Sequence, residues 1–197
     1  MIKTSNSIQK LIDHFASLPS IGKKSAQRLV FHLLKKDEKY LKDFADSILE
    51  ISKSVKLCNQ CFNFTDDDPC NICSSNKRKS NIICVVEQAS DVLVIEKTNE
   101  YYGKYHVLHG LINPIDGVTP DLLKIKELMS RLLNVDEVIL ALNPTIEGEI
   151  TIQYLTKLIK PLEIKISRIA RGVPIGSSLE FTDQATISNA LESRIYI

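Results

Sequence analysis

Residues 58–73 read CNQCFNFTDDDPCNIC, and within them two Cys-x-x-Cys pairs are separated by eight residues. This spacing lets four thiolates converge on one Zn²⁺ with tetrahedral geometry. We therefore predict one zinc ion per chain, bound by Cys58, Cys61, Cys70 and Cys73. Four protein ligands close the site, so the metal is structural and holds together a module of about 25 residues, too small for a core of its own. Two disulfides or unrelated thiols are the alternative.

The expected compartment favours zinc over disulfides. The start of the chain, Met1 to Asn6, lacks the apolar core of a signal peptide, and no uncharged apolar run approaches the ~18 residues of a membrane span. We expect a cytoplasmic protein with no membrane partner, and cytoplasmic thiols stay reduced. The fifth cysteine, Cys84, lies within the apolar run 82–86 and is expected to be a small core residue.

The segment before the cysteines is predicted to be helical. Apolar residues follow helical spacing in 8–15, 26–34 and 41–49, and the turn Pro19-Ser20-Ile21-Gly22 separates the first two stretches. We expect the three apolar stripes to bury against one another in a small helical unit.

The segment after the cysteines is predicted to be an α/β domain. Short β-rich apolar runs at 82–86, 105–108, 138–142 and 164–169 indicate strands, and 122–133 and 150–159 indicate helices. Residues 92–95 have strand propensity, but a helix there keeps the alternation regular, so we predict a helix. Strands that alternate with helices form a mostly parallel sheet with helices packed on it.

The charge of the chain is unevenly distributed. The total is +1, which taken alone argues against a nucleic-acid partner. Residues 1–57 hold 11 basic and 6 acidic residues, however, and residues 81–197 hold 11 and 15. The near-neutral total therefore averages a basic N-terminal part with an acidic C-terminal part.

The turn between the first two helices is a candidate phosphate-binding element. Gly22 precedes a helix start, where free backbone N–H groups and the positive helix end attract anions. Lys23, Lys24 and Arg28 add positive charge on the same side. Contacts to phosphates carry no sequence information, so we predict DNA binding without sequence preference. An ordinary helix corner with a solvated basic face is the alternative.

Three acidic residues follow predicted strands. Glu87 comes after the run 82–86, and Glu147 and Glu149 come after 138–142. Carboxylates at the C-terminal ends of adjacent parallel strands face one crevice, where they could hold Mg²⁺ or act as acid and base. The pattern resembles the Toprim fold of topoisomerases and primases, but a Glu-x-Glu stands where catalytic members carry Asp-x-Asp. Exposed loop acids without a role are the alternative.

The chain as a whole resembles the RecR family of bacterial recombination mediators. The resemblance rests on Leu18-Pro19, Gly22, the runs 24–29 and 31–34, the run YHVLHGLINP with Gly117, and the C-terminal runs ARGVPIG and LEFTD. Ser20 and Lys23 stand where the family usually has Gly and Pro, which bears on the geometry of the turn, and Ser177-Ser178 departs from the family's usual small and acidic residues.

The resemblance implies four modules. They are a helix-hairpin-helix DNA-binding domain at 1–56, a four-cysteine zinc module at 57–80, a Toprim domain at 81–170, and a C-terminal segment at 171–197 with a Walker-B-like run and a helix. In the family, the positions of Lys24 and Arg28 are implicated in DNA binding, and the Toprim domain is a scaffold and partner-binding surface without catalytic residues.

The implied function is non-enzymatic DNA repair. Family members act with RecO, and in many bacteria RecF, in RecBC-independent recombination, loading recombinase onto gapped DNA. A homo-oligomer, as a tetrameric ring or a dimer, and a cytoplasmic, nucleoid-associated location are implied as well. Two other hypotheses are a Mg²⁺-dependent Toprim nuclease or topoisomerase that uses Glu87, Glu147 and Glu149, and a zinc-stabilised adaptor that binds only protein.

Overall fold

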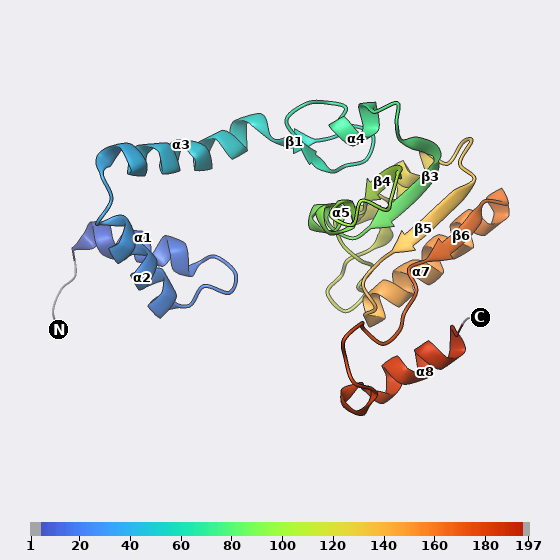
Figure 1. Cartoon of the computed structure of the whole chain (residues 1–197). Helices are drawn as coiled ribbons and strands as arrows, with labels where there is room; N and C mark the ends of the chain where they lie inside the picture. The colour runs from blue at the N-terminus through green and yellow to red at the C-terminus, as the bar shows by residue number, and fades with distance from the viewer. Residues whose placement is uncertain (1–4, 195–197) are drawn as a thin grey trace. The chain divides into compact units, whose positions relative to one another are not determined.

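The computed structural model describes residues 5–194, and the chain divides into two compact units, residues 1–55 and 56–197 (Figure 1). The outer ends of the predicted first and last modules, residues 1–4 and 195–197, lie outside the described residues. None of the helices within 5–194 combines the length and apolar character that a bilayer-spanning helix needs.

The N-terminal unit contains the three expected helices, α1 (Asn6–Ala16), α2 (Lys23–Leu33) and α3 (Glu38–Ser54). The first two pack as a hairpin around the buried side chains of Ile12, Ala26 and Val30. The α1 and α2 stripes are therefore buried against each other only in part, because Leu11, Leu29 and Leu34 of the predicted apolar positions stay exposed.

The third helix departs from the expectation that all three stripes would be buried together. Asp37 caps α3 by accepting a hydrogen bond from the Tyr40 backbone N–H at 2.8 Å, so the helix start is well defined. Its apolar stripe nevertheless stays open, because none of its residues is buried and Ile48 and Leu49 are more than half exposed. Helical spacing predicts an apolar face but does not name the surface that covers it.

The second unit begins with the cysteine module. Strands β1 (Lys56–Leu57) and β2 (Phe64–Thr65) pair antiparallel, and the short helix α4 (Asn71–Ser74) follows.

A four-stranded parallel sheet makes up most of the second unit. Its strand order is β4-β3-β5-β6, formed by β3 (Lys79–Val86), β4 (Gly103–Val107), β5 (Glu137–Ala141) and β6 (Lys165–Arg168). The connecting helices are α5 (Ala89–Glu96), α6 (Ile125–Ser130) and α7 (Ile146–Ile159). The parallel α/β prediction is confirmed, including the helix predicted around 92–95.

The predicted helix at 122–133 is only partly correct. A 3₁₀ turn at Pro120–Leu122 precedes α6, and Leu123 between them has extended backbone. The Lys124 backbone N–H bonds to the Leu108 carbonyl at 3.1 Å. This bond to a distant loop replaces the helical one, so the run divides into two short pieces.

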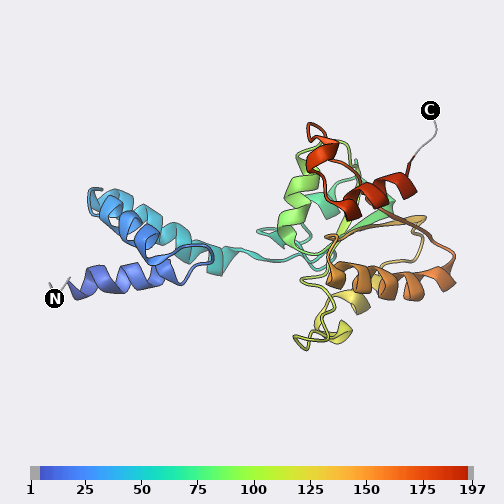
Figure 2. The ribbon, with the colours of Figure 1, turned by 90° about the horizontal axis from the view of Figure 1, so that it is seen from below.

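The two faces of the sheet are covered by different elements (Figure 2). Ile83, Val85 and Leu140 pack on one side with Leu155 and Ile159 of α7. Cys84 and Val86 point to the other side, where Val92 of α5 covers them. Side chains alternate across a strand, which accounts for this division of β3.

The C-terminal segment contains a 3₁₀ turn at Leu179–Phe181 and helix α8 (Gln184–Glu192). Asp183 caps α8 by accepting from the Thr186 backbone N–H at 2.9 Å. The helix expected within 171–197 is thus present.

Candidate metal centre and nucleic-acid interface

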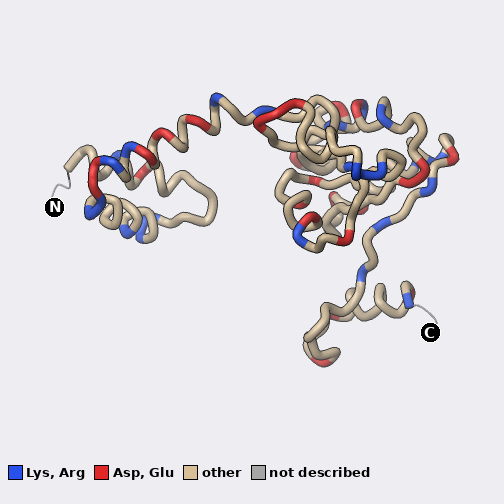
Figure 3. Tube along the Cα trace, turned by 45° about the horizontal axis from the view of Figure 1, so that its top comes forward, with Lys and Arg blue, Asp and Glu red and all other residues tan. Residues whose placement is uncertain are grey.

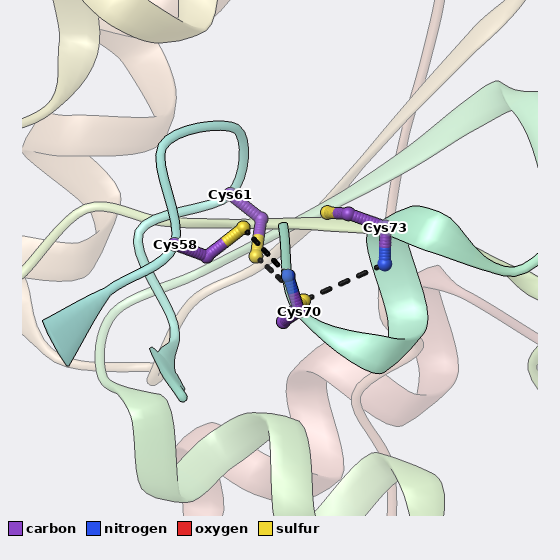
Figure 4. Close-up of side chains that lie close together, drawn as sticks. All are labelled: Cys58, Cys61, Cys70 and Cys73. Carbon is purple, nitrogen blue, oxygen red and sulfur yellow. Dashed lines mark hydrogen bonds between the residues drawn. The ribbon is translucent and has the colours of Figure 1, made fainter. Parts of the chain in front are cut away.

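The four predicted ligands come together at one point (Figure 4). The Sγ atoms of Cys58, Cys61, Cys70 and Cys73 all lie within 4.8 Å of one another, and those of Cys61 and Cys70 are 3.5 Å apart. Tetrahedral zinc with Zn–S bonds of about 2.3 Å requires sulfurs about 3.8 Å apart. The residues present fit a zinc site with four cysteine ligands.

Local backbone structure brings the sulfurs together. The β1-β2 hairpin closes the first pair, with the Cys58 N–H bonded to the Asn63 carbonyl at 2.8 Å. The Cys70 and Cys73 backbone N–H groups point at sulfurs, donating to Cys58 Sγ at 3.4 Å and to Cys70 Sγ at 3.5 Å. Such N–H···S bonds orient thiolate ligands and spread their negative charge.

The thiols are free and mostly buried. Only Cys73 is partly exposed, and none of the five cysteines forms a disulfide. The hydrogen bond from the Cys61 thiol lowers the pKa of Cys70, which favours a thiolate at the centre of the cluster. Cys84 lies apart in the sheet core, where burial raises its pKa to about 12, so it stays a neutral thiol as expected of a core residue.

A buried histidine joins the zinc module to the sheet. The fully buried His106 on β4 contacts the Phe62 ring edge-on, with ring centroids 5.4 Å apart. Its Nε2 lies 2.6 Å from the Lys124 carbonyl and its Nδ1 lies 2.9 Å from the Arg131 guanidinium, which donates. Burial lowers the pKa of His106 to about 4, so the imidazole is neutral near pH 7. Sequence reasoning missed this role, because the run that contains His106 reads as an ordinary strand.

The helix-hairpin-helix turn leaves the start of α2 open. Gly22 is its N-cap, no side chain caps the described helix, and its first turn contains no acidic residue. A Cβ on Gly22 would meet no protein atom within 4 Å. Packing within the chain therefore does not require glycine, and residues 22–25 are all exposed, so a phosphate can approach this helix end.

The predicted DNA-binding side chains are all solvent-exposed. Lys23, Lys24 and Arg28 lie on the first two turns of α2, and α2 carries only basic charges (Figure 3). Ser20 has a φ of 64°, in the left-handed region that favours glycine. Ser20 therefore adopts a conformation that suits Gly, the family's usual residue there, better than serine. Lys23, which stands where the family usually has Pro, is the first residue of α2.

The Toprim-like acids do not form one three-ligand site. Glu87 and Glu147 line the same pocket of about 390 Å³ at the C-terminal ends of β3 and β5. Glu87 Oε2 accepts a hydrogen bond from Asn143 Nδ2 at 2.8 Å. Among residues 5–194, the only group of three or more Cys, His, Asp or Glu ligands near one point is the cysteine cluster.

The third acid, Glu149, forms ion pairs with two arginines. Glu149 pairs with Arg171, and its second oxygen lies 3.7 Å from the Arg168 guanidinium. Arg171 belongs to the C-terminal run ARGVPIG, whose spacing along the chain does not reveal this contact. Glu149 therefore attaches the C-terminal segment to α7.

Comparison with known proteins supports the same modular order. Family models match at residues 8–51 (RecR, helix-hairpin-helix), 55–75 (RecR, four-cysteine zinc finger domain), 81–170 (Toprim domain) and 172–195 (RecR, C-terminal). The zinc finger match and the clustered thiols together identify a zinc-binding protein.

Curated relatives match along nearly their whole length. Recombination protein RecR of Chloroherpeton thalassium is 53% identical, covering 97% of each chain. The protein of the same name from Clostridium perfringens is 51% identical over 96% of each chain, and that from Chlorobium limicola is 50% identical over 97%. With its helix-hairpin-helix, four-cysteine zinc finger, Toprim sheet and C-terminal region, the chain belongs to the RecR family of recombination proteins.

Proposed function

We propose that this protein is a non-enzymatic mediator of recombinational DNA repair that binds DNA without sequence preference. The observation that carries the proposal is the open start of α2, where uncapped N–H groups, Gly22 and three exposed basic side chains share one end of a helix. Such a surface suits the phosphates of a DNA backbone and offers no reader for base edges.

Assembly would raise the weak affinity of a single basic hairpin. A unit with three basic contacts binds DNA modestly at physiological salt, whereas linked copies act at high effective concentration. The exposed apolar stripe of α3 is consistent with a homo-oligomer, because contiguous exposed apolar faces mark association surfaces. We propose a tetrameric ring or a dimer that holds gapped DNA.

The protein partners proposed are RecO and, where present, RecF. Residues 81–197 carry more acidic than basic residues, and Glu87 and Glu147 line one pocket of the Toprim domain. These acids could receive a basic partner surface. In this arrangement residues 1–56 bind DNA, residues 57–80 form the zinc module, and residues 81–170 and 171–197 form the partner-binding scaffold. The protein would act in the cytoplasm, at the nucleoid, where it helps to load recombinase at gaps.

The competing hypothesis of Mg²⁺-dependent strand cleavage has less support from the acid geometry. Glu149 is paired with two arginines and Glu87 with Asn143, so neither carboxylate is free to complete an octahedral magnesium site without rearrangement. Incubation of supercoiled DNA with the protein and Mg²⁺ tests this point. Cleavage or relaxation that Glu87→Ala abolishes would establish an enzyme and contradict the proposal.

A salt titration of DNA binding tests the interface itself. We expect Lys24→Ala/Arg28→Ala to weaken binding to gapped and duplex DNA and to reduce the slope of log K against log salt by about 2 per bound hairpin. Lys42→Ala/Lys53→Ala removes the same charge from α3 and is the matched control. Equal losses of DNA affinity in both double variants would mean general charge attraction and would contradict a DNA-binding site at the hairpin. Unchanged affinity in Lys24→Ala/Arg28→Ala would contradict it as well.

A further inference from the structure

The second Cys-x-x-Cys pair of the zinc module, Cys70 and Cys73, is built on a very short helix. Helix α4 has only four residues, and it carries the ligand Cys73 in its last turn. The last carbonyls of any helix lack intrahelical donors, and in α4 this leaves most of the helix without hydrogen bonds to stabilise it. The position of the Cys73 sulfur therefore depends on what satisfies these carbonyls.

One lysine of the sheet supplies the donors. Lys104 Nζ donates to the carbonyls of Ile72 and Cys73, each at 2.8 Å, and to that of Ser75 at 3.1 Å. An ammonium group has three N–H donors, and all three are used here. Lys104 thus fixes the backbone on both sides of Cys73.

A lysine is suited to this place for electrostatic reasons as well. A cation at a helix C-terminus interacts favourably with the exposed carbonyl dipoles. Four thiolates around Zn²⁺ carry a net negative charge, which a nearby ammonium stabilises. A neutral side chain of the same length would keep the packing of the stem and lose both effects.

The first Cys-x-x-Cys pair, Cys58 and Cys61, is attached to the same strand. The Val107 backbone N–H donates to the Cys61 carbonyl at 2.8 Å, and Val107 lies three residues after Lys104 on β4. Strand β4 is at the edge of the sheet. Both halves of the metal site are therefore bound to one rigid element through two contacts of different kinds.

We propose that Lys104 is a positioning residue for zinc: through it, strand β4 holds the Cys70–Cys73 pair in its metal-binding geometry. Residues that orient metal ligands without touching the metal typically change affinity 10- to 100-fold when removed. We expect Lys104→Met to lower zinc affinity about tenfold. This inference concerns the metal site only and does not depend on the proposed DNA function.

The test is a chelator competition with the full-length chain, using Co²⁺ and Zn²⁺ as probes. The sulfur-to-cobalt charge-transfer bands report ligation by thiolates, the d–d bands report tetrahedral geometry, and the competition gives the affinity. The matched control is Lys77→Met, which removes an exposed lysine from the loop just after α4. We expect weaker metal binding and altered cobalt bands in Lys104→Met, and wild-type values in Lys77→Met. In Lys104→Arg we expect an intermediate affinity, because the planar guanidinium keeps the charge but cannot donate to all three carbonyls.

Hydrogen exchange separates positioning from a general loss of structure. With zinc bound, Lys104→Met should speed amide exchange in residues 71–75 and leave the β1-β2 hairpin unchanged. Unchanged metal affinity in Lys104→Met, or equal weakening in the Lys77→Met control, would overturn the proposal. If Lys104→Met does not fold, Lys104→Arg and Lys77→Arg are compared instead, and identical zinc affinities in these two would overturn it as well.

Discussion

Replacing Gly22 with alanine should impair DNA binding while leaving the fold intact. The added Cβ meets no protein atom within 4 Å, and Gly22 has φ −78° and ψ 164°, which alanine adopts without strain. Alanine is a poorer N-cap than glycine by about 0.5–1 kcal/mol. Its lower entropy in the unfolded chain returns about 0.4–1 kcal/mol. The two effects nearly cancel, so the free energy of unfolding should change by less than about 0.5 kcal/mol.

The effect on DNA should be much larger. The added methyl group would stand beside the first N–H groups of α2, where the proposed phosphate contact requires a close approach of the backbone. A hydrogen bond to a charged group contributes about 1.5–3 kcal/mol, so losing one per hairpin should weaken binding about tenfold or more. Fluorescence anisotropy with a labelled gapped duplex at fixed salt measures the affinity, and thermal unfolding measures the stability.

Gly172→Ala is the matched control for this experiment. It makes the same chemical change at a position in the other unit, where a Cβ also meets nothing within 4 Å. Unchanged DNA affinity in Gly22→Ala would refute the idea that the backbone approaches a phosphate there. A large loss of stability would refute the conformational reasoning.

Three further predictions concern stability. Removing zinc with a chelator should expose residues 57–80 to proteolysis and lower the melting temperature of the chain, and a metal analysis well below one zinc per chain with no thermal change would contradict this. Ser20→Gly should raise the free energy of unfolding by about 0.5–1 kcal/mol, because Ser20 holds a φ of 64°, and an unchanged urea midpoint would argue against strain at the turn. The lowered pKa of His106, about 4, means that the unfolded chain binds more protons below pH 6.5, so stability is complete above pH 6.5 and falls as the pH decreases towards 4. The loss between pH 6.5 and 5 should reach about 1.5 kcal/mol in urea titrations, and a His106→Gln variant should flatten it.

The sequence was most informative where chemistry is local. Cys58 and Cys61 lie three residues apart, as do Cys70 and Cys73, so ligand type and spacing nearly determine the metal site. The four strands of the parallel sheet and most of the helices around it follow from the same kind of local pattern, whereas the short strands β1 and β2 were not predicted. The helical turn at Gly22 could also be placed from its neighbours alone.

Long-range contacts were not predictable in this way. The break before α6 depends on the Leu108 carbonyl, which bonds the Lys124 N–H from a loop far back in the chain. The pairing of Glu149 with Arg171 joins residues 22 positions apart. The open stripe of α3 was misjudged because amphipathic spacing gives no information about the partner.

The zinc module also affects how the sheet behaves towards other chains. At the outer edge of β4, the Val107 N–H is bonded to Cys61, and the Tyr105 carbonyl accepts from Arg131 at 2.8 Å. At the opposite edge, β6 presents the exposed charges of Lys165 and Arg168. Unpaired strand edges promote aggregation, and charged residues or covering segments prevent it. Loss of zinc, by oxidation or chelation, should therefore free the Val107 N–H at the edge of β4 from its partner Cys61 and favour edge-to-edge association of chains.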